Sequence, residues 1–268
     1  MKSAILPLIT ACLYLASGFL TGYRLIGHRG KPLPRNLPIG IAFAALLLHA
    51  IILYQGTILS DGYNLGIFNA FSLVAFVIIA ILMVSSLTKP VENLGIILLP
   101  VAAITLVLQL RFPGLNLLGS NAGWGLKLHV LISLLAYSLL TLASAQAILL
   151  AILDKQLHDR KPGNFVRAMP PLQTMEKLLF EMIAIGFVLL TAALISGFIY
   201  LENMFQQHLV HKTVLSILSW IFFGILLWGR FKFGWRGRVA IRWTLGGFVT
   251  LMLAYFGSKA VLEIFLVS

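Results

Sequence analysis

Apolar runs long enough to cross a membrane dominate this sequence. A helix rises 1.5 Å per residue, so about 20 apolar residues span the roughly 30 Å of hydrocarbon in a bilayer. Only 10% of the residues are charged, whereas a soluble domain carries about 25%. The sequence therefore predicts an all-α polytopic membrane protein, a bundle of about eight transmembrane helices formed by residues 1–268 as a single transmembrane domain. The expected spans are Ala4–Tyr23, Leu37–Tyr54, Gly66–Ser86, Leu94–Leu110, Leu128–Leu153, Leu178–Leu201, Thr213–Trp228 and Val239–Leu262.

The formal net charge of +12 is concentrated in alternate connections between these runs. Most Lys and Arg residues fall in the first, third, fifth and seventh connections, and the other side receives only Lys2, Arg111, Lys127, Lys212 and Lys259. By the positive-inside rule the basic side faces the cytoplasm, which places both termini on the extracytoplasmic side. The expected partner of this charge is thus the lipid bilayer, and no nucleic-acid site is needed to explain it.

Two features near the N-terminus limit what the chain can hold. Cys12 is the only cysteine, so neither an internal disulfide nor a Cys-x-x-Cys haem attachment can form, and any haem must be bound non-covalently. The run from Met1 to Thr21 lacks a small-residue cleavage site, so we interpret it as a retained first helix.

The long connection from Asp154 to Lys177 contains helix-breaking residues. Pro162, Gly163, Pro170 and Pro171 prevent one continuous helix there, although a short amphipathic piece could lie on the membrane surface. Such a piece could contact anionic lipid or a cytosolic partner.

His49 lies deepest in the membrane among the six histidines. It is about 12 residues into the second run, about 18 Å along a helix axis. An ionisable group at that depth should face the bundle interior and find a partner. The imidazole could be a ligand of haem iron, or it could make an interhelical hydrogen bond to a Ser, a Thr or a carbonyl.

His129 begins the fifth run, just after Gly123-Trp124-Gly125-Leu126-Lys127. The glycines there permit a tight re-entry into the membrane, and Trp124 suits the interfacial belt. His129 could bind a ligand at the outer membrane face, or it could be a solvated histidine at a helix start.

His208 and His211 are three residues apart in the connection 202–212, and would share one face if that segment were helical. A zinc site would need a third ligand, for which only Glu202 is available. We therefore expect loop histidines, with His211 and Lys212 opening the seventh helix.

Other classes of function find little support. Acidic residues are nearly absent from the spans, which argues against an ion-coupled transporter. No Walker A, His-Glu-x-x-His or Gly-x-Ser-x-Gly motif is present. The fifth helix carries a polar stripe that is more typical of interhelical contacts than of a substrate path: Ser133, Tyr137, Ser138, Ser144 and Gln146.

The order of these pieces resembles the cytochrome c assembly family of the CcsA, CcmC and ResC type, and within it the YpjD-like inner membrane proteins. The resemblance is carried by Leu48-His49-Ala50, Asp61–Gly66, His129-Val130 with Ala136-Tyr137, and a closing block. That block contains His211–Ser216, Leu227-Trp228-Gly229-Arg230, Gly234-Trp235-Arg236-Gly237-Arg238 and Ala254-Tyr255-Phe256-Gly257.

The resemblance implies a multi-pass protein of the bacterial inner membrane that handles haem at the outer face for delivery to apocytochrome c. By this resemblance His49 and His129 are the iron ligands of a haem b, Trp124 and His211 are further cofactor-binding candidates, and a membrane protein of cytochrome biogenesis is a possible partner. Two departures stand out, because the connection 202–212 has no tryptophan and no histidine lies near Gly257-Ser258-Lys259. They argue against full synthase activity.

The leading hypothesis is therefore a haem-binding or haem-handling membrane protein that uses His49 and His129. The alternative is a membrane scaffold or regulatory partner that retains the fold without the cofactor. Pigment in the purified protein would support haem binding, and its absence would favour the scaffold.

Overall fold

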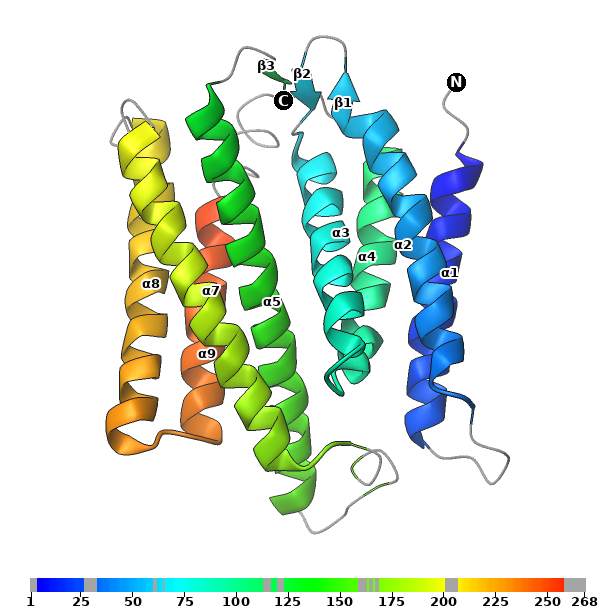
Figure 1. The fold of residues 1–268 in the computed structure, drawn as a ribbon, viewed down its shortest axis with the longest axis vertical. Helices are drawn as coiled ribbons and strands as arrows, with labels where there is room; N and C mark the ends of the chain where they lie inside the picture. Colours follow the sequence, from blue (N-terminus) through cyan, green and yellow to red (C-terminus); the bar gives the residue numbers. More distant parts are fainter. Residues whose placement is uncertain are drawn as a thin grey trace. The chain divides into compact units, whose positions relative to one another are not determined.

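The structure is a computed structural model that describes residues 4–26, 33–59, 62–64, 66–112, 117–119, 123–158, 163, 166, 169–200 and 207–257. Eight α-helices account for most of the described residues (Figure 1): α1 (Ile5–Ile26), α2 (Asn36–Thr57), α3 (Ile67–Ser86), α4 (Gly95–Arg111), α5 (Trp124–His158), α7 (Leu172–Tyr200), α8 (Gln207–Phe233) and α9 (Arg238–Met252). The short elements are β1 (Ile58–Leu59), β2 (Gly62–Asn64), the 3-10 helix η1 (Glu92–Leu94), β3 (Leu117–Gly119) and the π-helical turn η2 (Leu253–Gly257).

Seven of the described helices are long and apolar enough to cross a membrane, which makes the chain a multi-pass membrane protein. They are α1 to α5, α7 and α8. The eighth predicted span corresponds to α9, which has 15 residues and continues into η2. Residues 258–262 of that prediction lie outside the described residues, so the eighth crossing stays a prediction, as does the side on which the termini lie.

Two predicted connections were wrong at their ends. No tight re-entry occurs at Trp124–Lys127, because α5 begins at Trp124 and the backbone N–H groups of Leu126 and Lys127 donate to the carbonyl of Gly123. Similarly, α8 begins at Gln207, so His208 is helical rather than in a loop, and the helix that His211 was expected to open starts four residues earlier. Both errors have one cause: a helix can extend past the apolar run into the polar interface, where water or head groups satisfy its first N–H groups.

The connection between α5 and α7 is not one continuous helix, as the prolines predicted. Pro170 and Pro171 stand directly before the first residue of α7. Proline is tolerated there because the first helical N–H groups have no intrahelical partner.

The chain divides into two compact units, which are described separately. Unit 1 comprises residues 1–121 and 155–171. In it α1 packs against α2 and α4, and α3 packs against the same two helices. Gly18 makes the α1–α4 contact close, because a Cβ atom at this position would lie 3.3 Å from the Cδ atom of Pro100.

Unit 1 also contains a small antiparallel sheet that an all-α prediction omitted. Its strand order is β1-β2-β3, with Ile58 opposite Tyr63 and Gly62 opposite Gly119. Strands of two or three residues give too short an alternation to be recognised in sequence. The sheet joins the connection after α2 to the connection after α4.

Unit 2 comprises residues 122–154 and 172–268. Within it α7 packs against α8, and α8 packs against α9 and η2. The predicted polar stripe of α5 makes interhelical contacts: the Gln146 amide donates to the Met175 carbonyl of α7 over 3.0 Å, and the Tyr137 ring lies 6.0 Å from that of Phe248 on α9.

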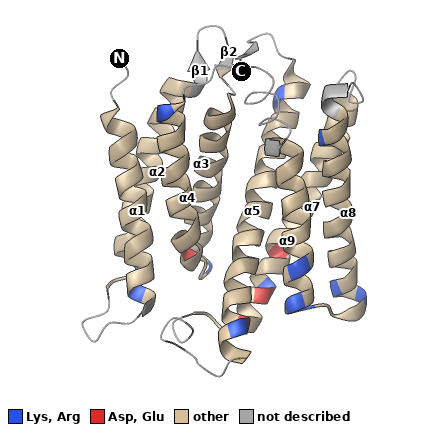
Figure 2. Cartoon of the chain, turned by 180° about the vertical axis from the view of Figure 1, so that it is seen from behind, with Lys and Arg blue, Asp and Glu red and all other residues tan. Residues whose placement is uncertain are grey.

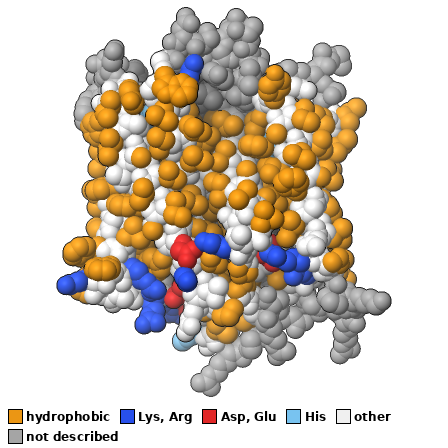
Figure 3. All heavy atoms as spheres, viewed as in Figure 1, with side chains coloured by type: hydrophobic (Ala, Val, Ile, Leu, Met, Phe, Trp, Pro, Cys, Tyr) orange, Lys and Arg blue, Asp and Glu red, His pale blue; other side chains and the backbone are white. Residues whose placement is uncertain are grey.

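The surface of the helices is that of a lipid-facing protein. Large apolar side chains such as Phe19 (71% exposed) and Val188 (66% exposed) point outward, and hydrophobic side chains cover most of the face in Figure 3. In unit 2 most Lys and Arg residues lie at one end of the helices, with a few at the other end (Figure 2). This charge distribution agrees with spans that end at a head-group layer.

Candidate functional site

His49 lies on α2 in the interior of unit 1, as predicted from its depth. The residue is 0% exposed. Its Nδ1 atom is 3.1 Å from the Tyr14 hydroxyl on α1, and its Nε2 atom is 2.9 Å from the Ser72 hydroxyl on α3. The imidazole therefore joins three helices through two hydrogen bonds.

Two aromatic rings also pack against the imidazole of His49. The rings of Tyr14 and Phe76 meet it edge-on, with centroids 5.8 and 5.5 Å away. An iron ligand must direct a nitrogen lone pair at the metal, but a hydroxyl occupies the hydrogen-bonding position at each nitrogen of His49. The arrangement fits a helix-to-helix hydrogen bond, and it fits an iron ligand only if Tyr14 or Ser72 moves away.

His129 lies on α5 in unit 2 and is half-buried. Its Nδ1 atom is 3.0 Å from the hydroxyl oxygen of Ser196 on α7. The Ser196 hydroxyl in turn donates to the carbonyl of Ala193, also over 3.0 Å. His129 is thus held from one side by a single hydroxyl.

This short chain of hydrogen bonds is compatible with a metal-binding tautomer of His129. A serine hydroxyl has one proton; when Ser196 donates it to Ala193, Ser196 accepts a hydrogen bond from His129. Nδ1 must then carry the proton, and in the neutral ring Nε2 carries the lone pair. In this tautomer Nε2 is the nitrogen that could bind a metal, so His129 fits an iron ligand.

Metal-binding histidines usually show this arrangement. Their second ring nitrogen donates to a protein oxygen, which fixes the tautomer and orients the ring. Ser196 supplies that oxygen here. Sequence reasoning missed Ser196, because it lies 67 residues from His129 and no spacing rule joins the two.

The first turn of α5 packs closely against the last turn of α7. A Cβ atom at Gly125 would come within 2.2 Å of the Tyr200 ring, so glycine is required for this approach. Trp124, one of the predicted cofactor-binding residues, is 80% exposed. That exposure agrees with an interfacial tryptophan and leaves its predicted contact with a cofactor untested.

His211, the other predicted candidate, is exposed on the first turns of α8. No group of three His, Cys, Asp or Glu side chains that could hold a metal is found among the described residues. The side chains of Glu202 and His208, which the zinc hypothesis required, lie outside them. The prediction that His49 and His129 are the two ligands of a haem stays a prediction, because His49 belongs to unit 1 and His129 to unit 2.

The middle of the closing block, residues 227–238, forms a compact turn between α8 and α9. The guanidinium of Arg230 donates to the carbonyl of Trp235 over 3.1 Å and lies 4.6 Å from the centroid of the Phe180 ring on α7. The carboxylate of Glu176, also on α7, accepts a hydrogen bond of 2.7 Å from the backbone N–H of Gly237, which has φ +56°. These residues therefore connect the start of α7 to the α8–α9 turn.

A sequence model of one protein family matches most of the chain. Its description is "Cytochrome C assembly protein", and it covers residues 39–266. The matched region begins within α2 and includes every later element as far as η2.

Three relatives illustrate the range of similarity. The chain is 37% identical over 237 residues to "Inner membrane protein YpjD" of Escherichia coli strain K12, covering 86% of this chain and 88% of the relative. It is 31% identical to the "Uncharacterized 28.8 kDa protein in nifR3-like 5'region" of Azospirillum brasilense, covering 68% and 69%. It is 26% identical to "Cytochrome c biogenesis protein CcsA" of Chlamydomonas reinhardtii, covering 53% and 40%. No solved structure gives a significant match.

Proposed function

Because the chain belongs to the cytochrome c assembly protein family, we propose that it handles haem in the bacterial inner membrane and that His129 is an iron ligand. The haem is non-covalent, since Cys12 is the only cysteine. When bound, it supplies the iron porphyrin that c-type cytochrome assembly uses.

The hydrogen bond between His129 and Ser196 carries this proposal. With Ser196 as the acceptor, the proton lies on Nδ1 and the lone pair on Nε2, the form of imidazole that binds a metal. It also restrains the ring, so a ligand-binding orientation exists before haem arrives. The name of the relative CcsA, a cytochrome c biogenesis protein, supports the same assignment.

His49 enters the proposal as the predicted second ligand, under one structural condition. Binding iron through Nε2 requires the Ser72 hydroxyl to leave its position 2.9 Å away. Removal of that hydroxyl should therefore leave haem binding intact or strengthen it.

The test is haem titration of the purified full-length protein, followed by its Soret band. His129→Ala should lose the band, whereas His158→Ala, a change to an exposed histidine at the other end of the same helix, should keep it. Ser196→Ala should weaken haem binding about 10-fold to 100-fold, and Ser196→Thr, which keeps a hydroxyl, should restore it. A Soret band that persists in His129→Ala would refute the proposal.

A scaffold that retains the fold without the cofactor is the second candidate function. The closed hydrogen bonds of His49 with Tyr14 and Ser72 favour it, as does the lack of tryptophan in the connection 202–212. Copurification of a stoichiometric membrane partner with no pigment would support the scaffold, and pigment in the protein isolated alone would reject it.

A further inference from the structure

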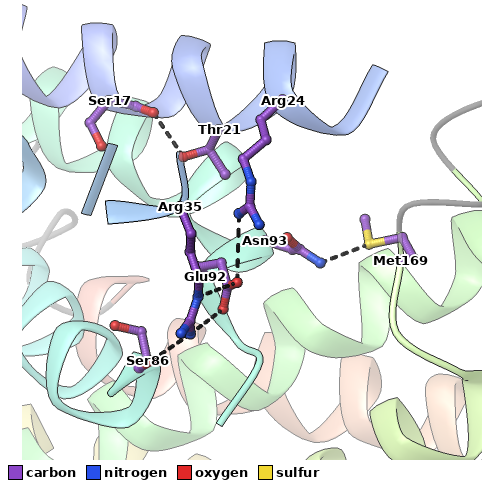
Figure 4. Close-up of polar contacts among 8 residues, drawn as sticks. All are labelled: Ser17, Thr21, Arg24, Arg35, Ser86, Glu92, Asn93 and Met169. Carbon is purple, nitrogen blue, oxygen red and sulfur yellow. Dashed lines mark hydrogen bonds and ion pairs between the residues drawn. The ribbon is translucent and has the colours of Figure 1, made fainter. Parts of the chain in front are cut away.

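One end of unit 1 carries an ionic cluster with more positive than negative charge (Figure 4). The Arg35 guanidinium donates from Nε to Oε1 of Glu92 over 2.9 Å and from Nη2 to Oε2 over 3.1 Å. The Nη1 atom of Arg24 lies 3.7 Å from the same Oε1 atom. Two guanidinium groups thus share one carboxylate.

The second arginine is not needed to neutralise Glu92. A bidentate pair with Arg35 already satisfies both carboxylate oxygens, and this hydrogen bonding raises the pKa of Arg35 above its ordinary value. Both arginines therefore stay charged, and the cluster keeps one positive charge in excess.

The arginines also retain unused donors. A guanidinium has five N–H groups. Arg35 uses its Nε and Nη2 groups on Glu92 and on the Ser86 carbonyl, the latter over 2.7 Å. Arg24 makes no hydrogen bond among the described residues beyond its longer ion pair with Glu92.

These donors are accessible from outside, whereas the carboxylate is not. The side chains of Arg24 and Arg35 are 28% and 40% exposed, compared with 12% for Glu92. An approaching anion would therefore meet the guanidinium groups, with Glu92 behind them as an internal anchor.

Exposed apolar side chains flank the arginines in sequence. Tyr23 (39% exposed) directly precedes Arg24, and Phe19 (71% exposed) lies one turn earlier on α1. Leu87, which follows Ser86, is 74% exposed. Arg24 lies in the last turn of a membrane-spanning helix, where the hydrocarbon layer meets the head groups.

We propose that Arg24 and Arg35 bind the phosphate of an anionic phospholipid, with its acyl chains along exposed apolar side chains such as those of Tyr23 and Leu87. Glu92 pairs with both arginines and lowers the positive charge that the lipid phosphate meets. A free phosphate offers the same charge, but it would not use the apolar surface.

The experiment is a lipid titration of the full-length protein in neutral detergent, with binding measured by native mass spectrometry. Phosphatidylglycerol should bind more tightly than phosphatidylcholine, and Arg24→Gln should reduce this preference about fivefold, the effect of one cation at a membrane surface. Arg24→Gln leaves the Arg35–Glu92 pair intact, so the protein should still fold. Arg236→Gln, at an exposed arginine of unit 2, is the control and should leave the preference unchanged.

A second variant separates binding from a purely structural cluster. Glu92→Gln removes the negative charge, so phosphatidylglycerol should bind several-fold more tightly, whereas a purely structural cluster would show only lower stability. Three results would overturn the proposal: an unchanged preference in Arg24→Gln, weaker lipid binding in Glu92→Gln, or binding of inorganic phosphate alone as tight as that of phosphatidylglycerol.

Discussion

Replacement of Gly229 by alanine tests how tightly the α8–α9 turn is built. A Cβ atom there would lie 2.3 Å from Cε3 and 2.4 Å from Cδ2 of Trp235. The tryptophan cannot easily move away, because its backbone N–H donates to the Gly229 carbonyl over 3.2 Å and its carbonyl accepts from Arg230 over 3.1 Å. Its ring also lies 5.7 Å from that of Trp243.

The expected loss of stability is the sum of two costs and one gain. Overpacking a well-packed site costs about 1–3 kcal/mol, and a further hydrogen bond of about 1 kcal/mol is lost if Trp235 shifts away from Arg230. Alanine regains about 1 kcal/mol of helix propensity. We therefore expect Gly229→Ala to destabilise the protein by about 1–3 kcal/mol.

Gly224→Ala on the same helix is the matched control. Its Cβ atom would lie 3.5 Å from the Phe187 ring, an ordinary contact, so only the gain in propensity remains and stability should stay equal or rise. Thermal unfolding in detergent measures both variants, and about 2–4 °C per kcal/mol is expected for a domain of this size. Equal melting temperatures for the two variants would refute the assignment of Trp235 as a fixed neighbour of Gly229.

Two further predictions concern hydrogen bonds between helices. Glu176→Leu should lower stability by about 1–3 kcal/mol, because it leaves the Gly237 N–H without its acceptor, whereas Glu176→Gln keeps an acceptor and should cost less stability. Equal melting temperatures for the two variants would assign the effect to the lost charge instead. Tyr14→Phe and Ser72→Ala should each lower stability by about 0.6–2 kcal/mol in the same assay, since each leaves one nitrogen of His49 unpaired. Unchanged melting temperatures would show that the hydrogen bonds of His49 to α1 and α3 contribute no stability.

The spans could be predicted from sequence because membrane insertion depends on composition and length. The same argument predicted that His49 would face inward, since a lipid-facing imidazole at that depth costs several kcal/mol. It did not predict the partners. Tyr14 and Ser72 lie 35 and 23 residues away on other helices, and helix rotation is decided by packing that no local pattern records.

The ends of α5 and α8 were harder to predict than their centres. Trp124–Lys127 and Gln207–Val210 are polar or glycine-containing, so their composition resembles a connection. The contact of Gly125 with Tyr200 shows what this composition does in the fold: a residue without a side chain lets the two helix ends approach. The glycine signal was thus correctly noticed but assigned to a turn instead of to packing.

His49 and His129 show why the same residue type in two apolar runs calls for different experiments. Loss of haem in His49→Ala could arise from a missing ligand or from a broken connection among α1, α2 and α3, so that variant alone decides nothing. Ser72→Ala separates the two roles, because it weakens the connection but frees Nε2 for iron. For His129 the ambiguity is smaller, since its side-chain partner Ser196 lies within hydrogen-bonding distance of both His129 and Ala193. The Ser196→Thr variant preserves that hydroxyl while the ligand is tested.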